Sequence, residues 1–103
     1  MRILLVCAAG MSTSLLVNNM KKFALKNDLI EAYPFHELDA LIDDYDVVLV
    51  GPQIRYKMND IEKLCREKKK AVGMIEMTTY GRVDGEAAMK QAKDLMTKEG
   101  GFI

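Results

Sequence analysis

The chain has 103 residues, of which 50% are hydrophobic and 29% are charged, and these values are typical of one globular domain. Fifteen basic residues balance fifteen acidic ones, so no overall basic field exists to attract nucleic acid or an anionic membrane surface. We therefore expect a single domain over residues 1–103 whose partners are selected by a local site.

The sequence contains no candidate membrane-spanning segment and no disulfide framework. Its longest apolar run, residues 3–9, is far shorter than the ~20 residues that cross a bilayer, and it does not continue as a secretory signal. The two cysteines, Cys7 and Cys65, are too few for a secreted framework and have no zinc-ligand spacing with the single His36. These features predict a reducing, cytoplasmic compartment.

Strand and helix patterns alternate in the first half of the chain. Residues 2–7 (RILLVC) form a short, nearly continuous apolar run that is typical of a strand buried on both faces of a parallel sheet. The next apolar residues recur at helical spacing, which predicts a helix over residues 13–26. A strand is predicted over residues 29–33, and a short helix over residues 37–43. The face expected to be buried on the first helix carries Leu16, Met20, Phe23 and Ala24.

The second half repeats the alternation. Residues 47–50 (VVLV) are rich in β-branched side chains and predict a central strand, and residues 56–69 predict a helix that ends in three lysines. A fourth strand is predicted over residues 71–75, a loop over residues 78–84 and a last helix over residues 85–98. The inward residues expected on that last helix are Ala88, Ala92, Leu95 and Met96.

This order of elements predicts an α/β fold. We expect a three-layer sandwich in which a four-stranded parallel sheet is flanked by helices. Ligands of such sheets bind outside the carboxyl ends of the strands, near the point where the strand order reverses. Residues 7–14, 34–38, 51–56 and 76–84 should meet at that edge.

Cys7 takes the last position of the first predicted strand, and a loop of small residues leads from it into a helix. In such a loop successive backbone N–H groups can point inward, and the helix start adds about half a positive charge. The same field favours the thiolate of a cysteine placed there. A phosphatase-like cysteine loop is therefore predicted after the first strand, with phosphoryl chemistry at the Cys7 sulfur. The phosphate-binding loop would comprise Ala8, Ala9, Gly10, Met11, Ser12, Thr13 and Ser14.

A structural role for either cysteine and a phosphatase role for the loop are alternative interpretations. Most free cysteines are small buried hydrophobes, and Cys65, in the apolar stripe of a predicted helix, is expected to be one. The loop also resembles that of low-molecular-weight phosphotyrosine phosphatases, in which an arginine follows the cysteine after five residues. Thr13 stands at that position, so the bidentate clamp for a transferring phosphoryl group is missing and ester hydrolysis should be poor.

Four further side chains are expected near the same edge. Gln53 and Tyr80 lie on segments that should border the cleft, where they form a candidate docking surface. Alternatively, Gln53 satisfies turn backbone and Tyr80 packs against the loop. Asp84 is predicted to cap the last helix, and His36 to have no catalytic role.

Three segments resemble the IIB component of the bacterial sugar phosphotransferase system, lactose/cellobiose (chitobiose) class. They are CAAGMSTSLLV at residues 7–17, VVLVGPQIRY at residues 47–56 and YGRVDG at residues 80–85. The resemblance covers essentially the whole chain. It implies that Cys7 takes phosphate from a phosphohistidine of the IIA protein and passes it to a sugar entering through the membrane IIC protein. Glu76 departs from the aspartate of many members.

We interpret the chain as a cytoplasmic phosphocarrier for a β-linked disaccharide of the cellobiose, chitobiose or lactose class. The chemistry requires no metal or other cofactor, because backbone amides offset the phosphoryl charge. Its expected partners are the IIA donor and the IIC acceptor, with no nucleic acid. The alternatives are a low-molecular-weight thiol phosphatase, an arsenate-reductase-like enzyme and a non-enzymatic regulatory binding domain.

Overall fold

Four parallel strands form one sheet in the computed structural model, which describes residues 1–8 and 11–100. The strands are β1 (Arg2–Cys7), β2 (Leu29–Pro34), β3 (Val47–Val50) and β4 (Ala71–Met74). They lie in the order β2-β1-β3-β4, and every neighbouring pair is parallel. The predicted strands and the predicted α/β fold are confirmed.

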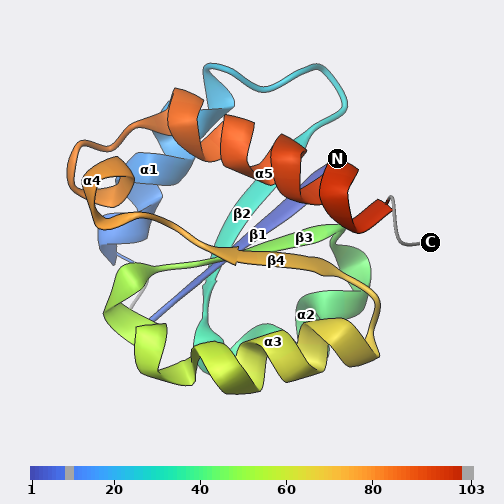
Figure 1. Ribbon diagram of the computed structural model, residues 1–103. Helices are drawn as coiled ribbons and strands as arrows, with labels where there is room; N and C mark the ends of the chain where they lie inside the picture. Colours follow the sequence, from blue (N-terminus) through green and yellow to red (C-terminus); the bar gives the residue numbers. More distant parts are fainter. Residues whose placement is uncertain (9–10, 101–103) are drawn as a thin grey trace.

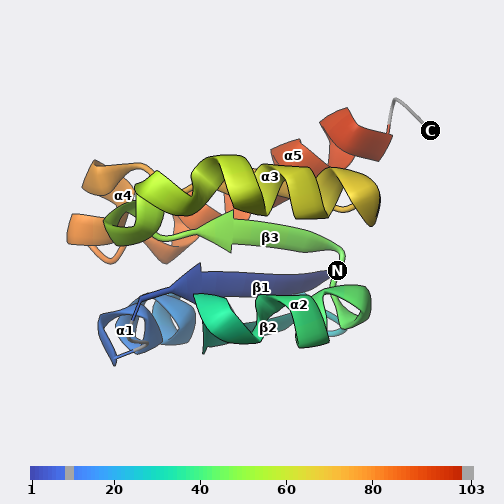
Figure 2. The ribbon, with the colours of Figure 1, turned by 90° about the horizontal axis from the view of Figure 1, so that it is seen from below.

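The apolar run of β1 is buried on both faces because its side chains alternate between two cores. Ile3 and Leu5 belong to the core under α1 (Met11–Lys21) and α5 (Gly85–Gly100). Leu4 and Val6 belong to the core under α2 (Leu38–Leu41) and α3 (Met58–Glu67). Figure 1 shows these two helical layers on opposite sides of the sheet, and Figure 2 views the molecule from the α2 and α3 side.

The first helix is shorter than the predicted range 13–26. It ends at Lys21, and the next three N–H groups bond to carbonyls three residues back in the chain. The carboxylate of Asp28 then accepts the N–H of Leu25 at 2.9 Å. These tighter turns redirect the chain because β2 must begin at Leu29, the register partner of Arg2 on β1.

The loop predicted over residues 78–84 is partly helical. It contains α4 (Met77–Gly81), whose Tyr80 N–H bonds to the Glu76 carbonyl at 2.9 Å. Five residues are too few for an apolar period to mark a helix. None of the helices within residues 1–8 and 11–100 is long and apolar enough to cross a membrane.

The other predicted helices differ mainly at their ends. The predicted helix 37–43 is split into the 3₁₀ turns η1 (Phe35–Glu37) and η2 (Ile42–Asp44) on either side of α2. The predicted helix 56–69 is α3, preceded by the 3₁₀ segment η3 (Pro52–Lys57). The last helix runs from Gly85 as predicted and continues to Gly100. Its four predicted inward residues all pack in or against the core on that side of the sheet.

A close backbone approach joins α5 to α1. The N–H of Gly85 donates to the Asn19 side-chain oxygen at 2.8 Å. A Cβ at Gly85 would stand 2.4 Å from the Asn19 carbonyl carbon and 2.5 Å from the Met20 nitrogen, so only glycine fits there. This contact positions the start of α5, and with it the segment that carries α4, beside α1 (Figure 1).

Candidate active site

Cys7 lies where the strand order reverses. From β1 the chain continues to β2 on one side, and it later returns to β3 on the other, so the crevice of the sheet opens beyond the carboxyl end of β1. Cys7 is the last residue of β1, in register with Pro34, and the N–H of Gly51 donates to the Val6 carbonyl at 2.9 Å. The ends of three neighbouring strands therefore surround the cysteine.

The Cys7 side chain is 3% exposed, and its Sγ lies 3.9 Å from the Tyr33 carbonyl oxygen, to which the thiol donates. A Cβ on Gly51 would stand 3.8 Å from the Cys7 Cβ and only 3.3 Å from the Val6 oxygen. Glycine at position 51 thus leaves room beside the cysteine for the Gln53 side chain, and a side chain at position 51 would crowd the β1 backbone.

The first turn of α1 contains an unsatisfied polar group. Thr13 is 1% exposed, and its Oγ1 has no hydrogen-bond partner within the described residues. A buried hydroxyl left without a partner costs roughly 1–3 kcal/mol, so native proteins rarely retain one. Because α1 begins at the edge where β1 ends (Figure 2), the positive end of its helix dipole and this hydroxyl are suited to an anion beside Cys7.

The predicted phosphate-binding loop is described only in part. Ala8 and Ser14 are exposed, whereas Ala9 and Gly10 lie outside the described residues. Met11 and Ser12 have helical backbone in the first turn of α1, which begins two residues earlier than predicted. The two ends of the loop are thus held by β1 and α1.

Gln53 and Tyr80 both lie on segments that follow strands at this edge. Gln53 is exposed on η3, and its Oε1 is 3.1 Å from the point that a Gly51 Cβ would occupy, on the same side as Cys7. Within the described residues it makes no hydrogen bond to turn backbone. Tyr80 is half-buried on α4 and packs against the core under α1 and α5.

Three exposed apolar side chains at the same edge are not marked by any sequence pattern. They are Leu15 of α1, Tyr56 of η3 and Met77 at the start of α4, with exposed fractions of 62%, 74% and 68%. Periodicity identifies inward residues, and it assigns the outward ones no role. We call these three residues the apolar rim, because α1, η3 and α4 follow the strands β1, β3 and β4, whose carboxyl ends share one edge of the sheet.

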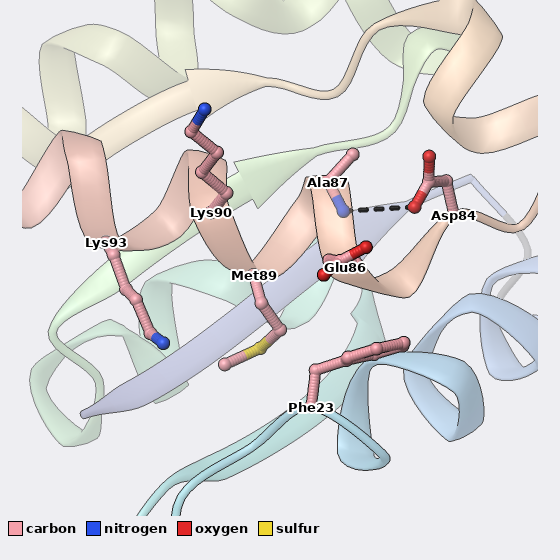
Figure 3. A pocket seen from close by; sticks show the side chains of 7 residues that line it. All are labelled: Phe23, Asp84, Glu86, Ala87, Met89, Lys90 and Lys93. Atoms are coloured by element: carbon pink, nitrogen blue, oxygen red, sulfur yellow. Dashed lines mark hydrogen bonds between the residues drawn. The ribbon is translucent and has the colours of Figure 1, made fainter.

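The remaining predicted residues have structural positions. Asp84 Oδ1 accepts the N–H of Ala87 at 3.0 Å, which confirms that it caps α5. Figure 3 shows this bond at one end of a pocket of about 620 Å³ on α5, where Phe23 and Lys93 face each other across Met89. This pocket does not include Cys7. Cys65 is fully buried in the core under α2 and α3, as predicted.

Fold and site together define a class of protein: an α/β domain with a cysteine at the switch point of its sheet and a helix N-terminus directly after it. The sequence matches the family described as the lactose/cellobiose-specific IIB subunit of the PTS system over residues 2–91. The chain belongs to this family, and it is therefore a phosphotransferase component of a sugar phosphotransferase system.

Individual relatives agree with this assignment. The chain is 37% identical to the oligo-beta-mannoside-specific EIIB component of Bacillus subtilis, covering 95% of this chain and 98% of the relative. It is 34% identical to the galactose-specific EIIB component of Lactococcus lactis subsp. cremoris, covering 91% of this chain and 94% of the relative. The solution structure of the cellobiose-specific IIB component of Borrelia burgdorferi superposes with a TM-score of 0.80 at 36% identity, covering 96% of this chain and 94% of that one.

A more distant structure shares the fold. The lactose-specific IIB domain of Streptococcus pneumoniae is 12% identical, with a TM-score of 0.72 over 94% of this chain and 91% of that one. The four-stranded parallel architecture thus persists where most of the sequence has changed.

Proposed function

We propose that Cys7 is the residue of this IIB protein that carries the phosphoryl group. The observation that carries the proposal is the pairing of a cysteine at the sheet's switch point with an unsatisfied, buried Thr13 hydroxyl in the helix turn that follows. An anion bound there would accept a hydrogen bond from that hydroxyl and would be favoured by the positive end of the helix dipole.

The proposed reaction has two displacement steps. The Cys7 thiolate attacks the phosphorus of a phosphohistidine on the IIA protein, so the S–P bond forms as the P–N bond breaks and the imidazole leaves. A sugar hydroxyl then attacks the same phosphorus and gives up its proton to water, and the S–P bond breaks to regenerate the thiolate. Residues of the loop from Ala8 to Ser14 would offset the charge on the phosphoryl oxygens throughout.

The donor and the acceptor are both proposed to approach Cys7 from the carboxyl edge of the sheet. The apolar rim offers the donor a contact surface, because its three exposed apolar side chains belong to elements that follow strands at the carboxyl edge of the sheet. Gln53 and Tyr80 are the polar candidates for the same docking surface. The acceptor is the membrane IIC protein, so the protein would act at the cytoplasmic face of the membrane.

The sugar is proposed to be a β-linked disaccharide of the cellobiose, chitobiose or lactose class. Relatives named for oligo-beta-mannoside and for cellobiose support this class, and a relative named for galactose widens the range to be tested.

A thiol phosphatase or an arsenate-reductase-like enzyme is not favoured. Thr13 occupies the position of the phosphatase arginine and is buried in the first turn of α1, so it cannot supply a bidentate clamp on a phosphate ester. The family and the relatives are all phosphotransferase components.

The test is the intact mass of the protein after incubation with phosphorylated IIA protein. The wild type should gain one phosphate, Cys7→Ser should gain none, and the matched Cys65→Ala variant should still be labelled. Serine fails because its alcohol ionises too weakly to act as a nucleophile without a general base. Equal loss of labelling in both variants would contradict the assignment to Cys7.

A further inference from the structure

Charge is unevenly distributed along this neutral chain. Residues 27–54 contain seven of the fifteen acidic residues and neither lysine nor arginine. Several of these carboxylates have partners: Asp28 pairs with the amino group of Met1, Asp43 with Lys68, Glu31 accepts the Tyr45 hydroxyl and Asp46 accepts the N–H of Arg2. Asp39, which is exposed on α2, has no hydrogen bond or ion pair within the described residues.

Asp39 lies on a cleft of about 300 Å³ between the α2 segment and α3. Its lining residues are Phe35, His36, Leu38, Asp39, Asp60, Ile61 and Leu64, and we call it the acidic cleft. Leu38 and Ile61 are buried and Leu64 is half-buried, so the floor is apolar. Asp60, on the first turn of α3, is exposed and likewise unpaired within the described residues.

The Lys57 ammonium lies 5.2 Å from the centroid of the Phe35 ring, which lines the cleft. Neither Asp39 nor Asp60 makes an ion pair within residues 1–8 and 11–100. Within residues 1–8 and 11–100 no three His, Cys, Asp or Glu side chains are arranged to hold a metal ion.

The acidic cleft adjoins the active site yet is separate from most of the apolar rim. Phe35 and His36 directly follow Pro34, the register partner of Cys7, so the cleft begins at the carboxyl edge of the sheet. It extends between helices that cover one face of the sheet, whereas Leu15 and Met77 belong to helices on the other side (Figure 1). A partner centred on Cys7 can fill the cleft without covering the whole rim.

We propose that the acidic cleft docks an apolar segment bearing lysine or arginine on the cytoplasmic face of the membrane IIC acceptor. This rests on the proposed function, which requires such an acceptor. Cytoplasmic loops of membrane proteins carry an excess of lysine and arginine, so the acceptor presents the charge that the two unpaired carboxylates lack. The apolar floor accommodates the methylene stems or neighbouring apolar residues of that segment.

The experiment compares two double variants that remove equal charge. Asp39→Asn with Asp60→Asn neutralises the cleft, and Glu67→Gln with Asp94→Asn neutralises exposed carboxylates of α3 and α5 outside it. Each protein is phosphorylated by the IIA protein and mixed with inside-out vesicles that contain the IIC protein and its sugar. Discharge of the phosphocysteine is followed against vesicle concentration, and binding of the unphosphorylated protein is measured by co-sedimentation.

We expect the cleft variant to need roughly tenfold more vesicles for half-maximal discharge, with an unchanged rate at saturation and an unchanged rate of phosphorylation by IIA. Its co-sedimentation should fall in parallel, and the wild-type affinity should fall with added salt. The proposal is overturned if the cleft variant behaves as wild type, if the control variant is equally impaired, or if vesicles without IIC bind as much protein. Failure of the wild type to accept phosphate would instead contradict the proposed function, and co-sedimentation would still test the cleft.

Discussion

At the scale of single residues, the site depends on the Thr13 hydroxyl. Its hydroxyl is buried in the first turn of α1 with no hydrogen-bond partner among the described residues. An unsatisfied buried hydroxyl lowers the free energy of unfolding of the free protein. A bound anion would accept its hydrogen bond, so we expect the hydroxyl to favour phosphoryl binding at some cost in stability.

Thr13→Val should therefore separate stability from activity. Valine has nearly the same shape and no hydroxyl, so the free energy of unfolding should rise by about 1 kcal/mol, measured by chemical denaturation. Acceptance of phosphate from the IIA protein should slow by roughly tenfold, which corresponds to one hydrogen bond of about 1.4 kcal/mol in the transition state. Thr13→Ser keeps the hydroxyl and should retain the rate; an unchanged rate in Thr13→Val would show that the hydroxyl does not contact phosphate.

At the scale of elements, the end of α3 contains a backbone conflict. The Lys69 N–H bonds to the Arg66 carbonyl at 3.2 Å and the Lys70 N–H to the Cys65 carbonyl at 2.8 Å, which are the two bonds of a Schellman motif. That motif places Lys69 at φ 59°, in the left-handed region that favours glycine. Lysine is tolerated there at a cost of roughly 1 kcal/mol.

Lys69→Gly should stabilise the protein by about 1 kcal/mol and raise its Tm by roughly 4–8 °C, measured by thermal unfolding. The neighbouring Lys68→Gly is the matched control. Lys68 has a right-handed φ of −92°, so glycine gains no conformational relief there and should lower the Tm. Equal shifts in both variants would mean that loss of positive charge, rather than backbone strain, determines the result.

At the scale of the whole molecule, Asp28 joins the turn after α1 to the start of the chain. The N–H of Leu25 donates to its carboxylate, which lowers the pKa of Asp28 below the ordinary value, and the amino group of Met1 at 3.1 Å acts in the same direction. A carboxyl whose pKa is lower in the folded state stabilises the fold above the unfolded pKa. That contribution is lost as the pH falls through the folded pKa.

Asp28→Asn should therefore reduce the free energy of unfolding at pH 7, by about 1 kcal/mol, and much less at pH 3 and below. Urea unfolding of both proteins across that range gives the measurement. Asp94→Asn on α5, which removes one exposed carboxyl away from Met1 and Leu25, is the charge-matched control. If the free energies of unfolding of the wild type and Asp28→Asn differ by the same amount down to pH 2, the stabilisation does not depend on ionisation of Asp28.

The sequence by itself determined the strands, the α/β class and the cysteine. Residues 3–7 and 47–50 are apolar without interruption, and such short runs bounded by turn residues are typical of strands buried on both faces. Cys7 could be singled out because a strand, a loop of small residues and a helical period follow one another there. The Asp84 cap was equally local, since its carboxylate bonds three residues along the chain.

Only the tertiary structure decided what depends on distant segments. The strand order places Cys7 at the switch point, and the need to begin β2 opposite Arg2 ends α1 at Lys21 rather than at Lys26. The unsatisfied Thr13 hydroxyl, the apolar rim and the acidic cleft each depend on which side chains find partners across the fold. Sequence patterns record which residues turn inward along one element, whereas burial and pairing between elements are set by the way the layers pack.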